Sequence, residues 1–107
     1  MNKITLLTGA TGFVGYQVLR ELNKQSIQTR VVIREGRAHK LPENSELESI
    51  VTTDDLFSES VDWWVDVLDG VDTIIHLAWY AEPGKYVTSI KNMDCMIGTL
   101  NIANAAI

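Results

Sequence analysis

The sequence has 107 residues, 46% of them hydrophobic, which is enough for one soluble domain with a modest core. Its net charge of −5, from nine Lys and Arg against fourteen Asp and Glu, argues against nucleic acid as a partner, because binding to phosphate backbones needs a basic surface. One cysteine and two histidines exclude an internal disulfide and a metal cluster of recognised spacing.

The chain carries no recognisable export or membrane signal. The first apolar run, residues 4–7, is too short for a signal peptide, and no stretch reaches the roughly 18 apolar residues of a membrane-spanning helix. The lone cysteine, Cys95, fits a reducing compartment. We therefore expect a cytoplasmic protein with no membrane partner.

The first half of the chain alternates apolar strands with a helix. Residues 4–7 are typical of a strand buried on both faces, and residues 13–22 carry apolar side chains at helical spacing. The β-branched residues of 29–33 predict a second strand, and residues 48–52 predict a weaker third one. Residues 34–46, which are polar and charged, predict a loop with a short helical turn.

The second half continues this alternation. From Ser58 onward, apolar side chains at helical spacing predict a helix that Gly70 ends, and residues 71–77 predict a fourth strand. A last helix follows Pro83-Gly84 and runs to the end of the chain. Its apolar stripe consists of Ile90, Met93, Ile97 and Leu100.

Four strands that alternate with helices predict an α/β fold, a Rossmann-like doubly wound parallel sheet with right-handed crossovers. We take residues 1–107 as one domain. Residues 101–107 still have helical character, and one side of the sheet stays open after about four strands. We therefore expect the N-terminal fragment of a longer parent chain, truncated within the fold.

Three glycines follow the first predicted strand in LLTGATGFVG, residues 6–15. In a strand, turn and helix of this kind, Gly9 makes the tight turn, Gly12 lets backbone N–H groups approach a pyrophosphate, and Gly15 lets helix and strand pack closely. The phosphates then lie at the helix N-terminus, where the helix dipole favours negative charge. The alternative is that the three glycines serve only the turn and its packing.

The end of the second strand bears on which dinucleotide binds. A site for NAD usually has an acidic residue there for the ribose 2′-hydroxyl, whereas a site for NADP has an arginine for the 2′-phosphate. Arg34 lies at the strand end, with Arg37 and Lys40 just beyond, so we predict NADP rather than NAD. Two alternatives stay open, namely that Glu35 accepts the 2′-hydroxyl and that the segment is only a solvated charged loop.

Four segments together carry a family resemblance. They are TGATGFVG at 8–15, Asp55-Leu56, IIHLAW at 74–79 and GTLNIANAA at 98–106. In this order they resemble the extended branch of the short-chain dehydrogenase/reductase superfamily, the NAD(P)-dependent epimerases, dehydratases and reductases. The resemblance and the two arginines imply one set of cofactor-binding residues: Gly9, Thr11, Gly12, Phe13, Val14, Gly15, Arg34, Arg37, Asp55, Leu56, Leu77, Ala78 and Trp79. In this set Asp55 is implied to contact adenine.

The chain departs from the family pattern in two places. Cys95 stands where the family usually has an asparagine that helps to position the cofactor. Trp79 and Tyr80 stand where small residues are common, which implies an aromatic edge on the nicotinamide or substrate pocket. The alternative for these two aromatics is packing within a surface loop.

The resemblance implies hydride transfer on a nucleotide-linked sugar, by an epimerase, dehydratase or reductase that often forms homodimers. The family's Tyr-x-x-x-Lys pair, which supplies proton transfer, is absent, because Tyr16, Tyr80 and Tyr86 are not followed four residues later by lysine. We therefore assign no catalytic residue and expect the segment to bind cofactor without completing a reaction. The alternatives are a non-catalytic NAD(P)-binding sensor and a structural domain with a vestigial glycine loop.

Other candidate residues receive structural roles. His76 lies inside an apolar strand, where a lone histidine is more often packed and hydrogen-bonded than catalytic. We expect Trp63 and Trp64 to serve packing, because acidic residues surround them and a nucleic-acid stacking site needs positive charge. Asp54 and Asp55 do not form an acid-base pair, since adjacent residues at a strand end point apart.

Overall fold

The computed structural model describes residues 3–79 and 89–107. The chain forms two compact units, which we call the sheet unit (Met1–Asp54 and Gly70–Ala78) and the helical unit (Asp55–Asp69 and Trp79–Ile107). Pro83-Gly84, Tyr80 and Tyr86, which the sequence analysis singled out, lie outside the described residues.

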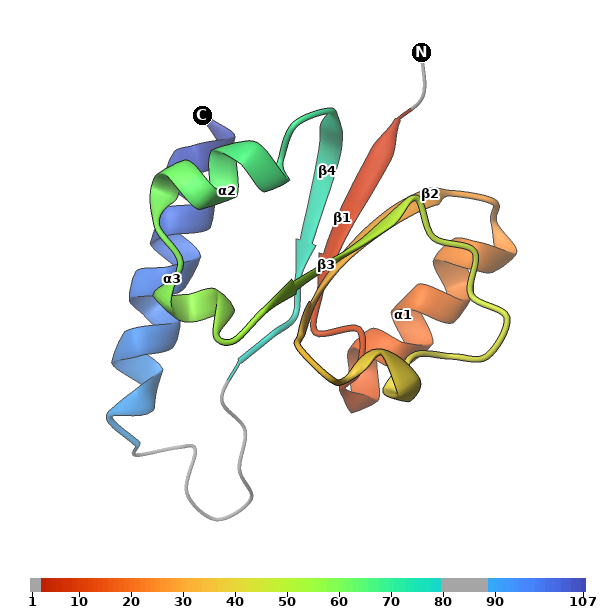
Figure 1. Cartoon of the computed structure of the whole chain (residues 1–107), viewed down its shortest axis with the longest axis horizontal. Helices are drawn as coiled ribbons and strands as arrows, with labels where there is room; N and C mark the ends of the chain where they lie inside the picture. Colours follow the sequence, from red (N-terminus) through yellow and green to blue (C-terminus); the bar gives the residue numbers. More distant parts are fainter. Residues whose placement is uncertain (1–2, 80–88) are drawn as a thin grey trace. The chain divides into compact units, whose positions relative to one another are not determined.

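The sheet unit is built on four parallel strands in the order β3-β2-β1-β4, as Figure 1 shows. All four predicted strands are present, as β1(Ile4–Thr8), β2(Gln28–Arg34), β3(Ser49–Thr53) and β4(Val71–His76). The chain moves outward from β1 to β2 and β3 and then returns to the other side of β1 with β4. The strand order therefore reverses between β1 and β4, at the carboxyl ends of these strands.

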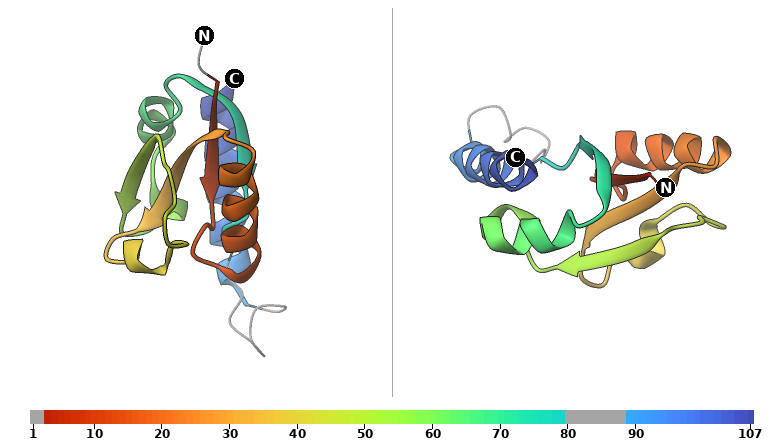
Figure 2. Two further views of the ribbon diagram at one scale, coloured as in Figure 1. Left: turned by 90° about the vertical axis from the view of Figure 1, so that its right-hand side faces the viewer. Right: turned by 90° about the horizontal axis from the view of Figure 1, so that it is seen from above.

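Helix α1 (Phe13–Lys24) packs on one face of this sheet, and Figure 2 shows it running alongside the strands. The core between them contains Leu7, Ala10, Leu19, Val31 and Ile33, none of which is more than 3% exposed. Continuous apolar runs such as that of β1 are expected where a parallel sheet is buried on both faces. The predicted first helix is thus confirmed. Its buried side chains hold α1 against the sheet directly after β1.

The segment between β2 and β3 contains one short 3-10 helix, η1 (Ala38–Lys40), as the sequence predicts. The segment is anchored by the Arg30 guanidinium, whose Nε and Nη2 donate to the two carboxylate oxygens of Glu48 at 2.9 and 3.1 Å. The hydrogen bonds that Glu48 accepts from Arg30 and Ser49 lower its pKa to about 2. This ion pair joins β2 to the residue that precedes β3.

The helical unit contains η2 (Leu56–Ser58), α2 (Val61–Val67) and α3 (Lys91–Ala106). The single helix predicted from Ser58 is wrong at its start, because Ser60 has extended backbone and interrupts it. The Ser60 hydroxyl accepts a hydrogen bond from Trp63 N at 3.1 Å, so α2 begins with an N-cap of the usual kind. Trp64 is fully buried and meets Trp63 edge-on, which confirms that these two residues serve packing.

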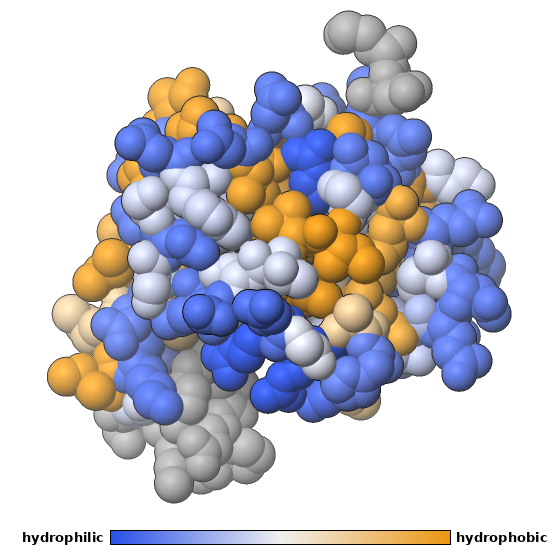
Figure 3. Space-filling model, viewed as in Figure 1, coloured by the Kyte–Doolittle hydropathy of each residue, from blue (hydrophilic) through white to orange (hydrophobic). Residues whose placement is uncertain are grey.

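Within this unit α3 approaches η2 closely at Gly98. A Cβ on Gly98 would lie 2.7 Å from Phe57 Cα, so only glycine allows α3 to approach η2 this closely. Cys95, Gly98 and Ile102 are the buried residues of α3. The apolar stripe that the sequence predicts on this helix is not its packed face, because all four members of the stripe are at least 53% exposed. Figure 3 shows apolar side chains at the surface on the side where Figure 1 draws α3.

No helix among residues 3–79 and 89–107 is both long enough and apolar enough to cross a bilayer.

Candidate functional site

The connection from β1 to α1 is a closed turn of four residues. Gly9 adopts φ +81°, and its carbonyl oxygen accepts a hydrogen bond from Gly12 N at 3.0 Å. Gly12 is the N-cap of α1, and its own carbonyl oxygen accepts from Tyr16 N at 2.9 Å, the first hydrogen bond of the helix. The chain therefore passes from the carboxyl end of β1 directly into a helix N-terminus.

Two of the three glycines of this segment are required by the fold itself. Gly9 has a left-handed backbone, and a Cβ on it would lie 2.8 Å from Ala78 N. A Cβ on Gly15 would lie 1.8 Å from the carbonyl oxygen of Gly9. Gly12 has φ −86° and is exposed, and the nearest atom to its Cβ position is the Gly9 oxygen at 3.4 Å, an ordinary contact. Turn and packing thus require glycine at Gly9 and Gly15, whereas at Gly12 only the N-cap position favours glycine over an apolar side chain.

The N-terminus of α1 is open to a ligand. No side chain caps it, and no acidic residue lies in its first turn. The first N–H groups of a helix have no partner within the helix and, together with the dipole, favour an anion. Thr11 is half-buried, whereas Phe13 and Val14 are 89% and 58% exposed, so the predicted residues of this turn surround an accessible helix end.

The ends of β1 and β4 are tied together beside this turn. Thr8 is fully buried, and its Oγ1 accepts hydrogen bonds from Leu77 N at 3.1 Å and Ala78 N at 3.2 Å. The same oxygen lies 2.6 Å from His76 Nδ1. Burial lowers the pKa of His76. The structure confirms that His76 is a packed, hydrogen-bonded residue, and it brings Leu77 and Ala78 against Gly9.

Sequence analysis did not select Thr8, although the residue stands directly before the first glycine. Its position at the start of TGATGFVG is the signal that was available. What the sequence does not reveal is the partner, because the Thr8 hydroxyl bonds to a strand that lies 68 to 70 residues further along the chain.

The two predicted arginines lie at the carboxyl end of β2. Arg34 is the last residue of the strand and is exposed, and Arg37 N donates to Arg34 O at 3.1 Å in the turn that follows. Glu35 is also exposed, and its N–H donates to Thr53 O at 3.0 Å, so the pairing with β3 continues for one more residue. Side chains of successive residues in a strand point to opposite faces. The side chains of Arg34 and Glu35 therefore point to opposite sides, so a ligand at this strand end would contact one of them rather than both.

Asp55, Leu56 and Trp79 belong to the helical unit. The Asp55 carboxylate caps η2, with Oδ1 accepting from Phe57 N at 3.0 Å and Oδ2 accepting from Ser58 Oγ at 2.8 Å. Leu56 is half-buried.

Trp79 and Cys95 are two of the three residues that the sequence analysis sets apart from the family pattern, and the third, Tyr80, lies outside the described residues. Trp79 is 46% exposed, its Nε1 donates to Asn92 Oδ1 at 2.7 Å, and its ring meets Phe57 edge-on at 6.5 Å. The indole is therefore held in place while much of its surface remains accessible. Cys95 is buried, and its carbonyl oxygen accepts from Thr99 Oγ1 at 2.8 Å.

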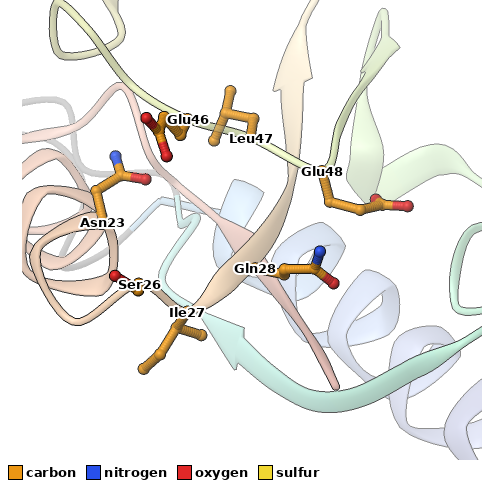
Figure 4. A pocket seen from close by; sticks show the side chains of 7 residues that line it. All are labelled: Asn23, Ser26, Ile27, Gln28, Glu46, Leu47 and Glu48. Atoms are coloured by element: carbon orange, nitrogen blue, oxygen red, sulfur yellow. The ribbon is translucent and has the colours of Figure 1, made fainter. Parts of the chain in front are cut away.

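A separate hollow of about 250 Å³ lies at the amino ends of β2 and β3, away from the glycine-rich turn (Figure 4). Its walls come from the end of α1, the start of β2 and the segment before β3. The described residues that line it include the carboxylates of Glu46 and Glu48 and no lysine or arginine. This charge makes the hollow a poor site for a pyrophosphate.

Comparison with known proteins gives one family and several solved structures. The model of the NAD dependent epimerase/dehydratase family matches residues 5–107. The crystal structure of gox2253 is 30% identical over 98% of this chain and 31% of its own, with a TM-score of 0.74. UDP-N-acetylglucosamine 4-epimerase from Bacillus cereus is 23% identical over 98% of this chain and 34% of its own, with a TM-score of 0.67.

A further structure, the enzyme WbmH from Bordetella bronchiseptica in complex with NAD+, is 16% identical over 99% of this chain and 36% of its own, with a TM-score of 0.71. The chain thus spans about a third of the length of these structures. None of the curated proteins compared with the sequence matches it. The similar structures confirm the predicted Rossmann-like α/β fold.

Proposed function

The chain belongs to the NAD-dependent epimerase/dehydratase family, and we propose that it is the cofactor-binding part of a family member that epimerises, dehydrates or reduces a nucleotide-linked sugar. The substrate class is supported by a structural neighbour described as UDP-N-acetylglucosamine 4-epimerase and by another, WbmG, in complex with NAD and UDP. In this proposal residues 1–107 form the N-terminal part of a longer, cytoplasmic parent chain. The parent chain forms a homodimer, as members of this family often do.

Gly12 is the observation that carries the proposal. The fold accepts a Cβ at this position, because no atom lies closer than 3.4 Å to it and the backbone is not left-handed. A bare backbone at the exposed cap of an uncapped helix fits a ligand that approaches closely, and a pyrophosphate needs such an approach. The position also lies next to the reversal of strand order, where ligands bind in open parallel sheets.

In this proposal the pyrophosphate is held by backbone N–H groups at the start of α1. Leu77 and Ala78 border the ribose and nicotinamide side, and Asp55 with Leu56 contacts the adenine. When bound, the nicotinamide ring supplies the hydride acceptor or donor. The Trp79 indole, anchored by Asn92 and Phe57, forms an aromatic edge toward the nicotinamide or the substrate.

The proposed cofactor is NADP rather than NAD. Arg34 ends β2 with its side chain exposed, and Arg37 follows in the same turn, so two guanidinium groups are available for a 2′-phosphate. Glu35 supports the rival, NAD, because it is exposed and still in register with β3.

The proposal assigns hydride transfer to the parent chain, because none of the three tyrosines of this sequence is followed four residues later by a lysine. A non-catalytic NAD(P)-binding sensor on the same fold is the alternative. Assaying the parent chain with nucleotide-linked sugars distinguishes the two, since only the enzyme changes the redox state of the cofactor or the configuration of the sugar.

Calorimetric titration of the chain with NADP+ and NAD+ tests the binding site. We expect Gly12→Val to abolish binding of both dinucleotides while the chain still folds, with a loss of stability of about 1 kcal/mol because valine is disfavoured at an N-cap. Gly70→Ala is the matched control, because Gly70 directly precedes β4 and so lies at the amino ends of the strands, away from the glycine-rich turn. It should lower stability, since Gly70 has φ +79°, and leave affinity unchanged. Unchanged binding in Gly12→Val would show that the site is wrong.

A further inference from the structure

The hollow at the amino ends of β2 and β3 lies at the opposite end of α1 from the glycine-rich turn, and all the residues that line it belong to the sheet unit (Figure 4). Here α1 ends, and the chain turns into β2 through Ser26, which has φ +58°. Ser26 N and Ile27 N donate to the carbonyl oxygens of Asn23 and Leu22, the usual closure of a helix C-terminus. One wall of the hollow is therefore the negative end of a helix dipole.

The Asn23 side chain brings to this hollow an acceptor that the fold does not use. Its Oδ1 is buried and has no hydrogen-bond partner in the part of the chain that the structure describes. Such atoms are rare in folded proteins, because nothing compensates their loss of hydration. Figure 4 shows the Asn23 amide and the Glu46 carboxylate pointing toward one another, one from α1 and the other from the segment before β3. A donor placed between them would satisfy both.

The charge of the hollow is negative and only partly neutralised. Of its two carboxylates, that of Glu48 accepts from Arg30, whereas that of Glu46 has no hydrogen bond or ion pair with any residue that the structure describes. A metal ion is a poor match for one free carboxylate, because Ca²⁺ takes about six to eight oxygen ligands. In the described part of the chain, no three acidic, histidine or cysteine side chains form a group that could hold a metal.

A primary ammonium group matches these features. It carries a positive charge and three N–H donors, and the side-chain oxygens of Asn23, Glu46 and Ser26 can each accept one of them. Ile27 and Leu47 also line the hollow, so a short carbon chain attached to the ammonium has apolar side chains to pack against. The volume of about 250 Å³ is below the roughly 300 Å³ at which sites for drug-sized molecules begin, which restricts the ligand to a small molecule.

We propose that the hollow at the carboxyl end of α1 binds a small molecule with a primary ammonium group on a short carbon chain, and that Asn23 and Glu46 hold the ammonium. This site is separate from the dinucleotide site, and the inference does not depend on the proposed function.

Nitrogen-15 NMR titration of the chain with n-butylammonium chloride tests the site at pH 7, where the probe is charged as a lysine side chain is. We expect saturable shifts of the backbone amides of residues 23–28 and 46–48. Two matched probes separate the contributions, since 1-butanol has the same carbon chain without the charge and tetramethylammonium has the charge without an N–H donor. Both should bind at least about tenfold more weakly.

Variants at the two holding residues test their roles. Glu46→Gln and Asn23→Leu should each weaken binding of n-butylammonium about tenfold, whereas Asn23→Asp, which adds a charge at the position of Oδ1, should strengthen it about threefold. Glu43→Gln is the matched control, because Glu43 is exposed in the same segment and does not line the hollow. Asn23→Leu should still fold, since Oδ1 has no partner to lose.

Several outcomes would overturn the proposal. One is the absence of saturable shifts with n-butylammonium, and another is equal binding of 1-butanol or tetramethylammonium. Tighter binding of Ca²⁺ at the same residues would indicate a metal site instead. Arg20 and Lys24 line the wider space outside the hollow, and a gain in affinity of about tenfold in Lys24→Gln would mean that this lysine is the occupant. Unchanged affinity in Glu46→Gln would also contradict the proposal, and this variant decides the question should Asn23→Leu fail to fold.

Discussion

The Cβ position of Gly15 lies 1.8 Å from the carbonyl oxygen of Gly9, so the first turn of α1 is in direct backbone contact with the end of β1. The same oxygen accepts the Gly12 N–H. The Gly9 carbonyl group therefore closes the turn and also contacts the first turn of α1. The position of the helix N-terminus thus depends on the absence of a side chain at Gly15.

This contact predicts that Gly15→Ala is strongly destabilising. A methyl group there must displace backbone rather than the end of a flexible side chain, and overpacking of this kind costs about 3 kcal/mol. Urea unfolding measures the loss. Gly12→Ala should change the free energy of unfolding by less than about 1 kcal/mol, because its Cβ has room. Equal losses in the two variants would contradict this account of the turn.

Gly98→Ala should destabilise the helical unit for the same physical reason. Alanine is favoured over glycine in a helix interior by about 1 kcal/mol, so propensity alone predicts a gain. Because the added Cβ would lie 2.7 Å from Phe57 Cα and 2.8 Å from its ring, we expect a net loss of about 2 kcal/mol instead. Thermal unfolding followed by tryptophan fluorescence reports it, and a rise in stability would show that α3 and η2 separate easily.

The pair of Arg30 and Glu48 predicts how stability depends on pH. The folded state holds the pKa of Glu48 at about 2, below its ordinary value of 4.5. A carboxyl with a lowered pKa stabilises the folded state above its unfolded pKa, and this stabilisation is lost as pH falls from about 4.5 through about 2. Because the pair is partly exposed, we expect a contribution of about 1 kcal/mol.

Glu48→Gln checks the assignment, because it removes the charge and keeps the shape. Urea unfolding near pH 7 and near pH 3 should show a smaller loss on acidification in the variant than in the unchanged chain. Parallel curves for the two proteins would mean that other carboxyl groups account for the acid sensitivity.

Arg34→Ala tests the choice of cofactor. If the guanidinium holds a 2′-phosphate, affinity for NADP+ should fall about tenfold while affinity for NAD+ changes little, since only NADP+ carries that group. Arg20→Ala is a suitable control, because Arg20 is an exposed arginine of α1. Glu35→Ala gives the converse, and a selective loss of NAD+ binding in that variant would favour the rival cofactor.

Local patterns were enough to predict all four strands and α1, because each combines an apolar run or stripe with clear turn residues. The start of α2 was predicted wrongly, since Ser60 interrupts the helix through a capping bond that apolar periodicity does not contain. The apolar stripe of α3 is real but exposed. Periodicity identifies an apolar face without saying which face is packed, and the packed face here depends on Gly98, a residue with no hydrophobic signal.

For the site, the sequence predicted the glycine-rich turn and its neighbours but not the reason for each glycine. That distinction needs the distance from each Cβ position to its surroundings, which separates Gly12 from Gly9 and Gly15. The role of Thr8 likewise depends on contacts across the sheet. The residues of a site can be selected from motifs, whereas their division of labour follows from long-range geometry.

The bond from Ala78 N to Thr8 Oγ1 joins residues 70 positions apart, so the glycine-rich turn is completed by one of the most non-local contacts of the sheet unit. During synthesis, β1, α1 and β2 can assemble while β4 is still missing, but the backbone that borders Gly9 arrives only with the residues after His76. Cofactor capture would then report that β4 has docked in register. A dinucleotide that binds only this closed arrangement would shift the folding equilibrium toward it, with the largest effect on the strand that is added last.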